Sequence, residues 1–383
     1  MPDKIPVPQT ILPGETLGML GGGQLGRMFV VAARSMGYEV IVLDPDPDSP
    51  AGSMATEHLE ANFNDKESLD YLASQCRVIS TEFENIPAEN LEYLAQSRPV
   101  HPSAEVIRIA QNRIKEKNFI RDLGLNTVDF VAIESEQDLA ELYDFDFPAI
   151  MKTATLGYDG KGQVVCHSAT DVKNAFNGLK QVSCVLEKKI DLALEVSVVL
   201  SRNQIGEINC FPIAENTHLN GILDTSIVPA RLNQKMSDQV IEAAKKIAHG
   251  LDYVGVMAVE FFVSTDEQIL INEIAPRPHN SGHYTLDACR VSQFEQQVRA
   301  ICNLPSGNCN LQTPVVMWNI LGDLWPENDS PNWEKLLFDG NAKLYLYGKK
   351  QARLGRKMGH VNFLAENVAA AQNKLKLYLN QLD

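Results

Sequence analysis

The chain has 383 residues with 34 basic and 49 acidic side chains, giving a formal net charge of −15. This length predicts two or three domains, and the acidic balance argues against a nucleic-acid ligand. Seven cysteines without a CxxC pair are typical of a reducing compartment, so we expect a cytoplasmic protein without structural disulfides. No apolar run approaches the ~18 residues that a membrane span needs. The composition therefore predicts a cytoplasmic α/β enzyme with no membrane partner.

The first hundred residues alternate between apolar strands and amphipathic helices. Strands separated by helices predict a parallel sheet, and Pro99 and Pro102 indicate a boundary near residue 105. The expected strands are 16–20, 40–43 and 77–81. One expected helix follows the segment 21–26 and runs to about residue 36, and another covers 87–96.

The remainder of the chain is richer in strand patterns. We expect helices at 104–122, 135–144, 169–180 and 236–250, and strands at 149–152, 184–187, 196–200, 205–211, 254–263 and 269–274. Further strands are expected at 315–321 and 342–347, followed by a final strand and helix. The fold class is thus a mixture of α/β and α+β.

A glycine motif follows the first strand. Gly21, Gly23 and Gly26 fit G-x-G-x-x-G, and Asp44 stands about twenty residues later, as in dinucleotide-binding folds. The free N–H groups of the next helix favour an anion. The same glycines also serve close helix–strand packing, so NAD, another ligand and packing all remain open.

A second glycine-rich segment, Gly157-Tyr158-Asp159-Gly160-Lys161-Gly162-Gln163, follows the strand that ends at Lys152. Backbone N–H groups of such a loop can cover phosphates. It lacks the G-x-x-x-x-G-K-[ST] pattern of a P-loop. A surface hairpin is the alternative interpretation.

Two carboxylates indicate a cation site. A hairpin centred on Asp266-Glu267 would place Glu260 opposite Glu273, among apolar neighbours. Facing like charges destabilise a strand pair unless a cation is shared. Mg²⁺ held by one or two carboxylates and substrate phosphates suits this pair, and two exposed acids on an edge are the alternative.

Two further polar segments follow. The run from Ala275 to His283 delivers Arg277, His279, Asn280 and His283 directly after Glu273. A basic cluster of Lys349, Lys350, Arg353, Arg356 and Lys357 interrupts the otherwise acidic chain. This cluster fits either a phosphate site or a solvated face.

Taken together these strings resemble the ATP-grasp superfamily and, within it, the N5-carboxyaminoimidazole ribonucleotide synthetase family. The matching segments are 21–28, 82–85, 157–163, 272–283 and 356–360. The resemblance implies an N-terminal Rossmann-like domain (1–105), a central ATP-grasp domain (106–305) with a lid subdomain at about 125–190, and a small C-terminal domain (306–383).

The resemblance also implies the site residues. ATP would be held by Arg113, Lys152, Gly157, Tyr158, Asp159, Gly160, Lys161, Gly162, Gln163, Glu187, Lys188, Lys189, Ile190, Glu195, His218, Asn272 and Glu273. Glu260 and Glu273 would bind Mg²⁺, for which Mn²⁺ could substitute. The ribonucleotide would contact Gln24, Leu25, Glu82, Asn280, Lys349, Arg356 and Lys357, and the catalytic residues would be Lys152, Asp159, Arg277 and His283.

The activity implied is ATP- and bicarbonate-dependent carboxylation of 5-aminoimidazole ribonucleotide in purine synthesis, through carboxyphosphate, with ADP and phosphate as products. A homodimer, and transfer of the product to a separate mutase, are expected on the same basis. The alternatives are a formate-dependent glycinamide ribonucleotide transformylase, an NAD-dependent oxidoreductase resting on Gly21–Gly26 and Asp44, and a non-catalytic ATP-binding subunit.

Overall fold

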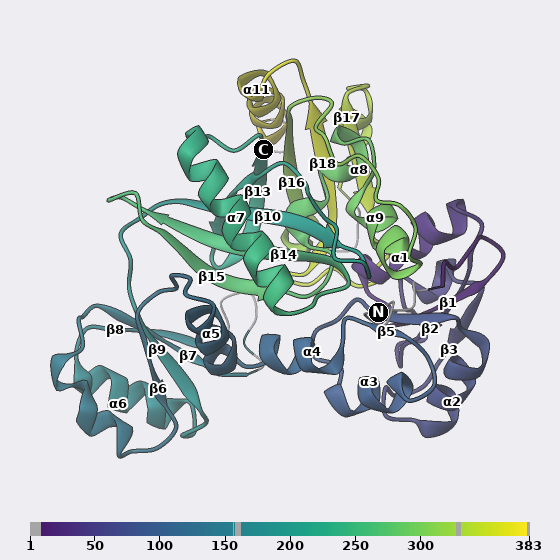
Figure 1. Cartoon of the computed structure of the whole chain (residues 1–383). Coiled ribbons are helices and arrows are strands. Elements are labelled where there is room, and N and C mark those ends of the chain that lie inside the picture. The colour runs from purple at the N-terminus through teal and green to yellow at the C-terminus, as the bar shows by residue number, and fades with distance from the viewer. Residues whose placement is uncertain (1–8, 156, 158–161, 327–330, 381–383) are drawn as a thin grey trace, which may run out of the picture.

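The computed structural model describes residues 9–155, 157, 162–326 and 331–380. Its strands form three sheets, which lie in three regions of the molecule (Figure 1). Among the described residues, no helix is both long and apolar enough to cross a membrane.

The N-terminal sheet is parallel, as the alternating pattern predicts. Its strand order is β3-β2-β1-β4-β5, with β1 Thr16–Leu20, β2 Glu39–Leu43, β3 Glu57–Leu59, β4 Val78–Thr81 and β5 Val100–His101. Helices α1 Gln24–Ser35, α2 Lys66–Gln75 and α3 Ala88–Ala95 accompany it. The three central strands, β1, β2 and β4, are buried on both faces, which explains their continuous apolar runs.

A nine-stranded antiparallel sheet occupies the centre. Its main path runs β15-β14-β10-β12-β13-β16-β18-β17, and β11 pairs with β10. The strands are β10 Leu192–Arg202, β11 Ile208–Cys210, β12 Ala214–Leu219, β13 Ile222–Val228, β14 Gly255–Ser264, β15 Ile269–Ala275, β16 Val315–Leu321, β17 Ala342–Leu346 and β18 Lys357–Leu364. The C-terminal strands thus extend the central sheet, since β16 pairs with β13.

Helices cover this sheet. The apolar side of α7 Gln234–Gly250 packs on β10, β14 and β15. The others are α8 Thr285–Ala288, α9 Gln293–Ile301, α10 Glu334–Leu337 and α11 Val368–Leu379. Helix α9 also packs against α1, which joins the central sheet to the N-terminal unit.

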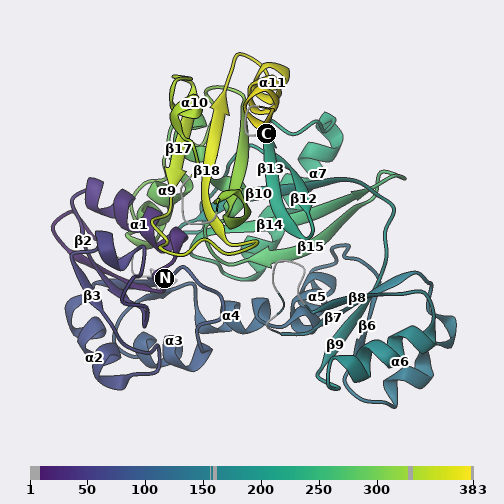
Figure 2. The same ribbon diagram turned by 180° about the vertical axis from the view of Figure 1, so that it is seen from behind.

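A small four-stranded sheet lies at the other end of the molecule from the N-terminal unit (Figure 2). Its order is β6-β9-β7-β8, with β6 Phe130–Ile133, β7 Ala149–Thr153, β8 Gln163–Cys166 and β9 Cys184–Lys188. Helix α6 Ala169–Gly178 and a 3₁₀ segment, Asp138–Asp144, pack on it.

Two expected helices are wrong in detail. The segment 104–122 forms two helices, α4 Ala104–Ala110 and α5 Arg113–Asp122, because the Asn112 side chain accepts N–H bonds from Ile114 and Lys115 at 3.0 and 3.1 Å and starts a new helix. The segment 135–144 is a 3₁₀ turn rather than an α-helix. The expected strand 205–211 shortens to β11 because Gly206, at φ +85°, lies in the preceding turn.

Candidate active site

A cavity of about 320 Å³ lies where the three sheets meet. The residues that line it come from every part of the chain, from Glu84 after β4 to Lys357 at the start of β18. Twelve of the predicted site residues line it: Arg113, Lys152, Gly157, Gln163, Glu195, His218, Glu260, Asn272, Glu273, Arg277, Asn280 and Lys357.

The carboxylates of Glu260 and Glu273 belong to facing residues of β14 and β15, as predicted. The reason differs from the expected one, because Val263 pairs with Ile269 and the turn is therefore centred on Asp266 alone. A β-bulge at Asn272 restores the pairing one step further on. Such a bulge re-aims side chains, and here the successive residues Asn272 and Glu273 both line the cavity.

The charges of this pair are poorly balanced by the protein. Burial, followed by the charge of Glu273, raises the pKa of Glu260 to about 7. Arg113 lies 3.6 Å from Glu273 (Nη1 to Oε2), and Asn272 Nδ2 lies 3.5 Å from Glu260 Oε2. Among the described residues no three His, Cys, Asp or Glu side chains form a metal cluster. Two carboxylates are what Mg²⁺ requires when substrate phosphates complete its shell, so the residues present fit that ion.

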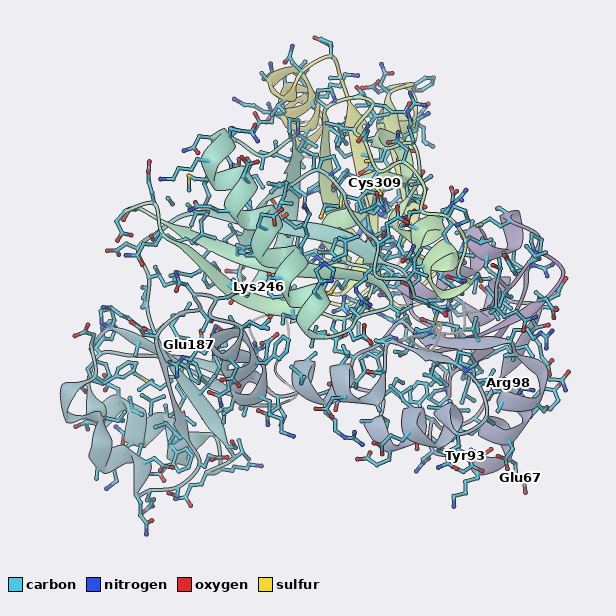
Figure 3. The ribbon with its side chains drawn as sticks, viewed as in Figure 1. Glu67, Tyr93, Arg98, Glu187, Lys246 and Cys309 are labelled. Atoms are coloured by element: carbon cyan, nitrogen blue, oxygen red, sulfur yellow. The ribbon has the colours of Figure 1, made fainter. Side chains whose placement is uncertain are left out.

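Lys152 is held by a buried ion-pair triad. Its Nζ lies 2.6 Å from Glu187 Oε2, and Lys117 Nζ lies 2.9 Å from Glu187 Oε1. Burial opposes ionisation of Glu187, but the two lysines outweigh it and lower its pKa to about 2. Lys152 lines the cavity and Glu187 does not; Figure 3 marks Glu187 within the small four-stranded unit.

The segment 187–190, which was predicted to contact adenine, has two different surroundings. The carboxylate of Glu187 is engaged by lysines, whereas Lys188, Lys189 and Ile190 line a separate hollow of about 580 Å³. Lys188 also forms an ion pair with Asp146 at 2.7 Å.

The ends of the second glycine loop face the cavity. Arg113 Nη2 donates to the carbonyl oxygen of Gly157 at 3.0 Å, and Gln163 begins β8. Gly162 has φ +74°, a conformation that favours glycine, and its carbonyl accepts from Thr153 N–H at 3.1 Å. The predicted residues Tyr158, Asp159, Gly160 and Lys161 lie outside the described residues.

Glu195 of β10 and His218 of β12 form a pair that also lines the cavity. His218 Nδ1 lies 2.6 Å from Glu195 Oε2. Burial acts to lower the pKa of His218, but the hydrogen bond with Glu195 and the nearby carboxylates raise it above its usual value. The pair therefore offers both an acceptor and a donor for hydroxyl groups of a ligand.

The polar run after β15 is only partly in the cavity. Arg277 pairs with Glu84, and both line the cavity. Asn280 is buried there, and neither its Oδ1 nor its Nδ2 has a hydrogen-bond partner within the described part of the chain. Unpaired buried amide groups facing a cavity are typical of a ligand contact.

The structure does not bring His283 to the cavity. Its ring is fully buried 4.8 Å from the ring of His360, and Gln293 Nε2 lies 3.0 Å from its Nδ1. Burial and the neighbouring His360 hold the pKa of His283 well below its usual range. His283 is thus a neutral core residue, and its predicted catalytic position is wrong because the chain turns inward after Asn280.

The first glycine loop is closed by the protein's own carboxylates. Glu82 accepts N–H bonds from Gly23 (2.5 Å) and Gly26 (2.7 Å), and Asp44 accepts one from Gly22 (2.7 Å). A Cβ on Gly23 would lie 2.6 Å from Glu82 Oε1, so the glycine permits this close approach. The N–H groups that a dinucleotide would use are already bonded, which argues against the NAD interpretation.

Of the predicted ribonucleotide contacts in the basic cluster, Lys349 reaches the first glycine loop. Gln24 Oε1 accepts from Lys349 Nζ at 2.8 Å, which links α1 to the C-terminal basic cluster. Lys349 also donates to the carbonyl of Lys357 at 2.8 Å, and Arg356 Nη1 donates to the carbonyl of Gln351 at 2.8 Å. The Leu25 side chain does not fit its predicted role, since it is buried in the apolar core of the N-terminal unit.

The sequence-based list misses the polar cavity residues Glu84, Asn85, Gln111, Glu116 and His279, and it misses Lys117, which pairs with Glu187. Glu116 is buried and lines the cavity, and its Oε1 accepts from Ile274 N–H at 2.6 Å. Burial, followed by the charge of Glu273, raises its pKa to about 8. Glu84 and His279 stand in the polar strings already singled out, but charged residues of a helix, such as Glu116 and Lys117, read as surface residues.

Comparison with known proteins agrees with this geometry. Three family models match: the ribonucleotide synthetase preATP-grasp domain over residues 14–111, the ATP-grasp domain over 118–294, and the phosphoribosylaminoimidazole carboxylase C-terminal domain over 315–374. The expected architecture is therefore confirmed.

Similar curated proteins include the N5-carboxyaminoimidazole ribonucleotide synthases of Bacillus subtilis and Brucella melitensis. The first is 42% identical over 360 residues, which is 94% of this chain and 93% of the relative. The second is 42% identical over 355 residues, which is 92% of this chain and 97% of the relative.

Similar solved structures include an N5-carboxyaminoimidazole ribonucleotide synthetase in an ADP complex, with a TM-score of 0.90, 44% identity, and coverage of 96% of this chain and 97% of that one. Another is the Aspergillus clavatus N5-carboxyaminoimidazole synthase in complex with ADP and 5-aminoimidazole ribonucleotide. Its TM-score is 0.89, its identity 31%, and the coverage 96% of this chain and 98% of that one.

Proposed function

The chain belongs to the N5-carboxyaminoimidazole ribonucleotide synthases, ATP-dependent ligases that carboxylate 5-aminoimidazole ribonucleotide in purine biosynthesis, and we propose how its own residues divide that work. The observation that carries the proposal is the unbalanced Glu260–Glu273 pair, which shares one cavity with Lys152 and Arg277. The transformylase, oxidoreductase and non-catalytic alternatives are set aside, because the similarity to carboxylating relatives extends over nearly the whole chain.

ATP binds in the cavity, with its phosphates between Lys152, Arg113 and the 157–163 loop. Lys152 is pre-positioned by Glu187, so little side-chain entropy is lost when the phosphate arrives. Glu260 and Glu273 would hold Mg²⁺, with Asn272 beside them, and Mn²⁺ would be accepted by the same oxygen ligands. The ion supplies charge neutralisation at the transferring phosphate. Glu195 and His218 stand ready for hydroxyl groups of the nucleotide.

Bicarbonate is the second substrate. One of its oxygens attacks the γ-phosphorus, the bond to the β-phosphate oxygen breaks, and ADP and carboxyphosphate form. Lys152 and Arg277 face the negative charge that develops during this transfer, which is electrostatic stabilisation rather than covalent catalysis. Arg277 is fixed for this by Glu84.

The ribonucleotide occupies the side of the cavity next to the first glycine loop. Its exocyclic amine attacks the carbonyl carbon of carboxyphosphate and displaces phosphate, or attacks CO₂ after the phosphate has left. On either route the amine proton passes to that phosphate. Glu82, Gln24 and Asn280 support the sugar and ring, and Lys349, Arg356 and Lys357 take the 5′-phosphate. The unpaired amide of Asn280 supports this placement.

The remaining expectations extend from the family. We propose a cytoplasmic homodimer that passes its product to a separate mutase. All seven cysteines are free in the structure, as suits a reducing compartment.

The test is a phosphate-release and product assay that combines bicarbonate or formate with 5-aminoimidazole ribonucleotide or glycinamide ribonucleotide. We expect ADP, phosphate and carboxylated product in equal amounts only with bicarbonate and 5-aminoimidazole ribonucleotide. Coupled product from formate and glycinamide ribonucleotide, without any from bicarbonate, would overturn the proposal.

A further inference from the structure

A chain of buried hydrogen bonds runs from the centre of the sheet to the candidate metal carboxylate. Ser226 Oγ lies 2.8 Å from Asn216 Oδ1, Asn216 Nδ2 lies 2.9 Å from Ser197 Oγ, and Ser197 Oγ lies 2.7 Å from Ser281 Oγ. Ser281 Oγ lies 2.8 Å from His279 Nδ1, and His279 Nε2 lies 3.2 Å from Glu260 Oε1. All members except Glu260 are more than nine-tenths buried.

The chemistry of the two ends gives this chain a direction. At the His279 end a backbone N–H fixes the direction, because such a group can only donate. The backbone N–H of Ser281 also points at His279 Nδ1, at 3.4 Å, which makes that nitrogen an acceptor. With Nδ1 as the acceptor, the ring proton lies on Nε2, the nitrogen that faces Glu260 Oε1 at 3.2 Å.

The other hydrogen bonds of this network can then be given consistent donors and acceptors. The Ser281 hydroxyl donates to His279, the Ser197 hydroxyl donates to Ser281, and Asn216 Nδ2 donates to Ser197. The carbonyl oxygen of Asn216 then accepts from Ser226. The hydroxyls of Ser281 and Ser197 each have one donor role and one acceptor role, as a satisfied buried network requires.

We propose that Ser281, Ser197 and Asn216 are positioning residues that fix the Nε2–H tautomer and ring orientation of His279, so that His279 holds one oxygen of Glu260 and leaves the other facing the cavity. This inference rests on the proposed role of Glu260 in holding the metal. Partners that orient a group next to a metal ligand typically change activity about 10- to 100-fold when they are removed.

The chain offers a matched control on the same strand. Ser201 lies four residues after Ser197 on β10, is equally buried, and accepts from an amide, Gln296 Nε2, at 2.9 Å. It takes no part in the contacts that lead to His279. Ser197→Ala and Ser201→Ala therefore each remove one buried hydroxyl group from β10. Only Ser197→Ala interrupts the series of hydrogen bonds that leads to His279.

The test is ¹⁵N NMR of the imidazole nitrogens in protein labelled at histidine, without metal or nucleotide, with the His279 signals assigned by their loss in His279→Gln. We expect a protonated Nε2 and an unprotonated Nδ1 in the wild type and in Ser201→Ala. In Ser197→Ala and Ser281→Ala we expect a detectable population protonated at Nδ1, because only the longer backbone N–H contact, at 3.4 Å, then holds Nδ1 as an acceptor. In the assay, Ser281→Ala should lower kcat about 10-fold with the KM for ATP within about twofold.

A wild-type His279 protonated at Nδ1, or an unchanged tautomer in both Ser197→Ala and Ser281→Ala, would overturn the proposal. If Ser197→Ala does not fold, Ser281→Ala gives the same information from the loop side. The tautomer is measured without metal or substrate, so this result stands or falls separately from the assignment of Glu260.

Discussion

The two glycine-rich loops have similar sequences and opposite surroundings. The first, Gly21–Gly26, opens helix α1, and its N–H groups are bonded to Glu82 and Asp44. The second, 157–163, has ends that face a cavity containing Lys152, Arg113 and Arg277. An N–H group that is bonded to an internal carboxylate has no bond left for a phosphate, and cations attract one.

The comparison shows that glycine spacing alone does not identify a nucleotide site. Both loops match patterns associated with phosphates, and the charges that surround each decide which one holds ATP. We assign ATP to the second loop and the ribonucleotide to the cavity wall beside the first.

The largest expected effect is a loss of ATP turnover when a predicted metal carboxylate is changed. The second loop can bind ATP phosphates productively only with that metal ion in place. Glu273→Gln should reduce ATP turnover about 1,000-fold, because several kcal/mol of charge stabilisation depend on the ion. The metal-free protein should be as stable as wild type or slightly more so, since a facing like charge is removed. Steady-state phosphate release and urea unfolding measure the two quantities.

Glu267→Gln is the control, because this exposed residue lies in the turn of the same hairpin. Near wild-type turnover of Glu273→Gln at saturating Mg²⁺ would remove the metal assignment.

The second expected effect concerns the residue that holds Lys152. Glu187→Gln leaves the two buried ammonium groups of Lys117 and Lys152 without their counterion. Breaking such a buried pair should lower the free energy of unfolding, measured by urea denaturation, by about 3–5 kcal/mol. Asp146→Asn breaks only the exposed pair with Lys188 and should cost about 0–1 kcal/mol.

The pH dependence of this effect has a definite sign. The pKa of Glu187 is lowered to about 2, so its stabilisation is fully present above the ordinary value of about 4.5 and disappears as the pH falls toward 2. The difference in unfolding free energy between wild type and Glu187→Gln should shrink over that range. A difference that is constant from pH 6 to pH 3 would contradict the triad.

A smaller effect is expected at the basic cluster beside the first loop. Arg356→Ala should weaken the apparent affinity for the ribonucleotide about 10- to 100-fold, as one charge-assisted hydrogen bond of about 1.5–3 kcal/mol is lost. The KM for ATP should barely change. Arg356→Lys should recover part of the loss.

Arg353→Ala serves as the control, because this exposed arginine lies three residues away in the same segment. Equal shifts for ATP and ribonucleotide in Arg356→Ala, or no shift for either, would remove the assignment of this cluster.

The sequence predicts the parallel N-terminal sheet, because hydrophobic periodicity is a local signal. It also predicts the pairing of Glu260 with Glu273, but from a turn centred on Asp266-Glu267, whereas the turn is centred on Asp266. It does not predict the bulge at Asn272 that produces that pairing. Nor does it predict the break at Asn112, where a side-chain cap divides one amphipathic pattern into two helices.

The missed site residues have a common physical cause. Glu116 and Lys117 lie on a helix whose charged side chains would ordinarily face water, and only tertiary packing buries them. Ser197, Asn216 and Ser226 are buried polar residues within strands, whose partners are distant in sequence. His283 is an error in the opposite direction. It belongs to the polar segment 275–283 and was predicted to be catalytic, but its side chain is buried in the core.

The most direct test of the two-loop assignment is a calorimetric titration of MgADP and of the ribonucleotide into Lys152→Met and Glu82→Gln. Lys152→Met retains the Lys117–Glu187 pair and should therefore fold. We expect Lys152→Met to weaken MgADP at least about 10-fold and leave ribonucleotide binding unchanged, and Glu82→Gln to do the opposite. Loss of MgADP affinity in Glu82→Gln, with normal affinity in Lys152→Met, would place the nucleotide at the first loop and contradict the account.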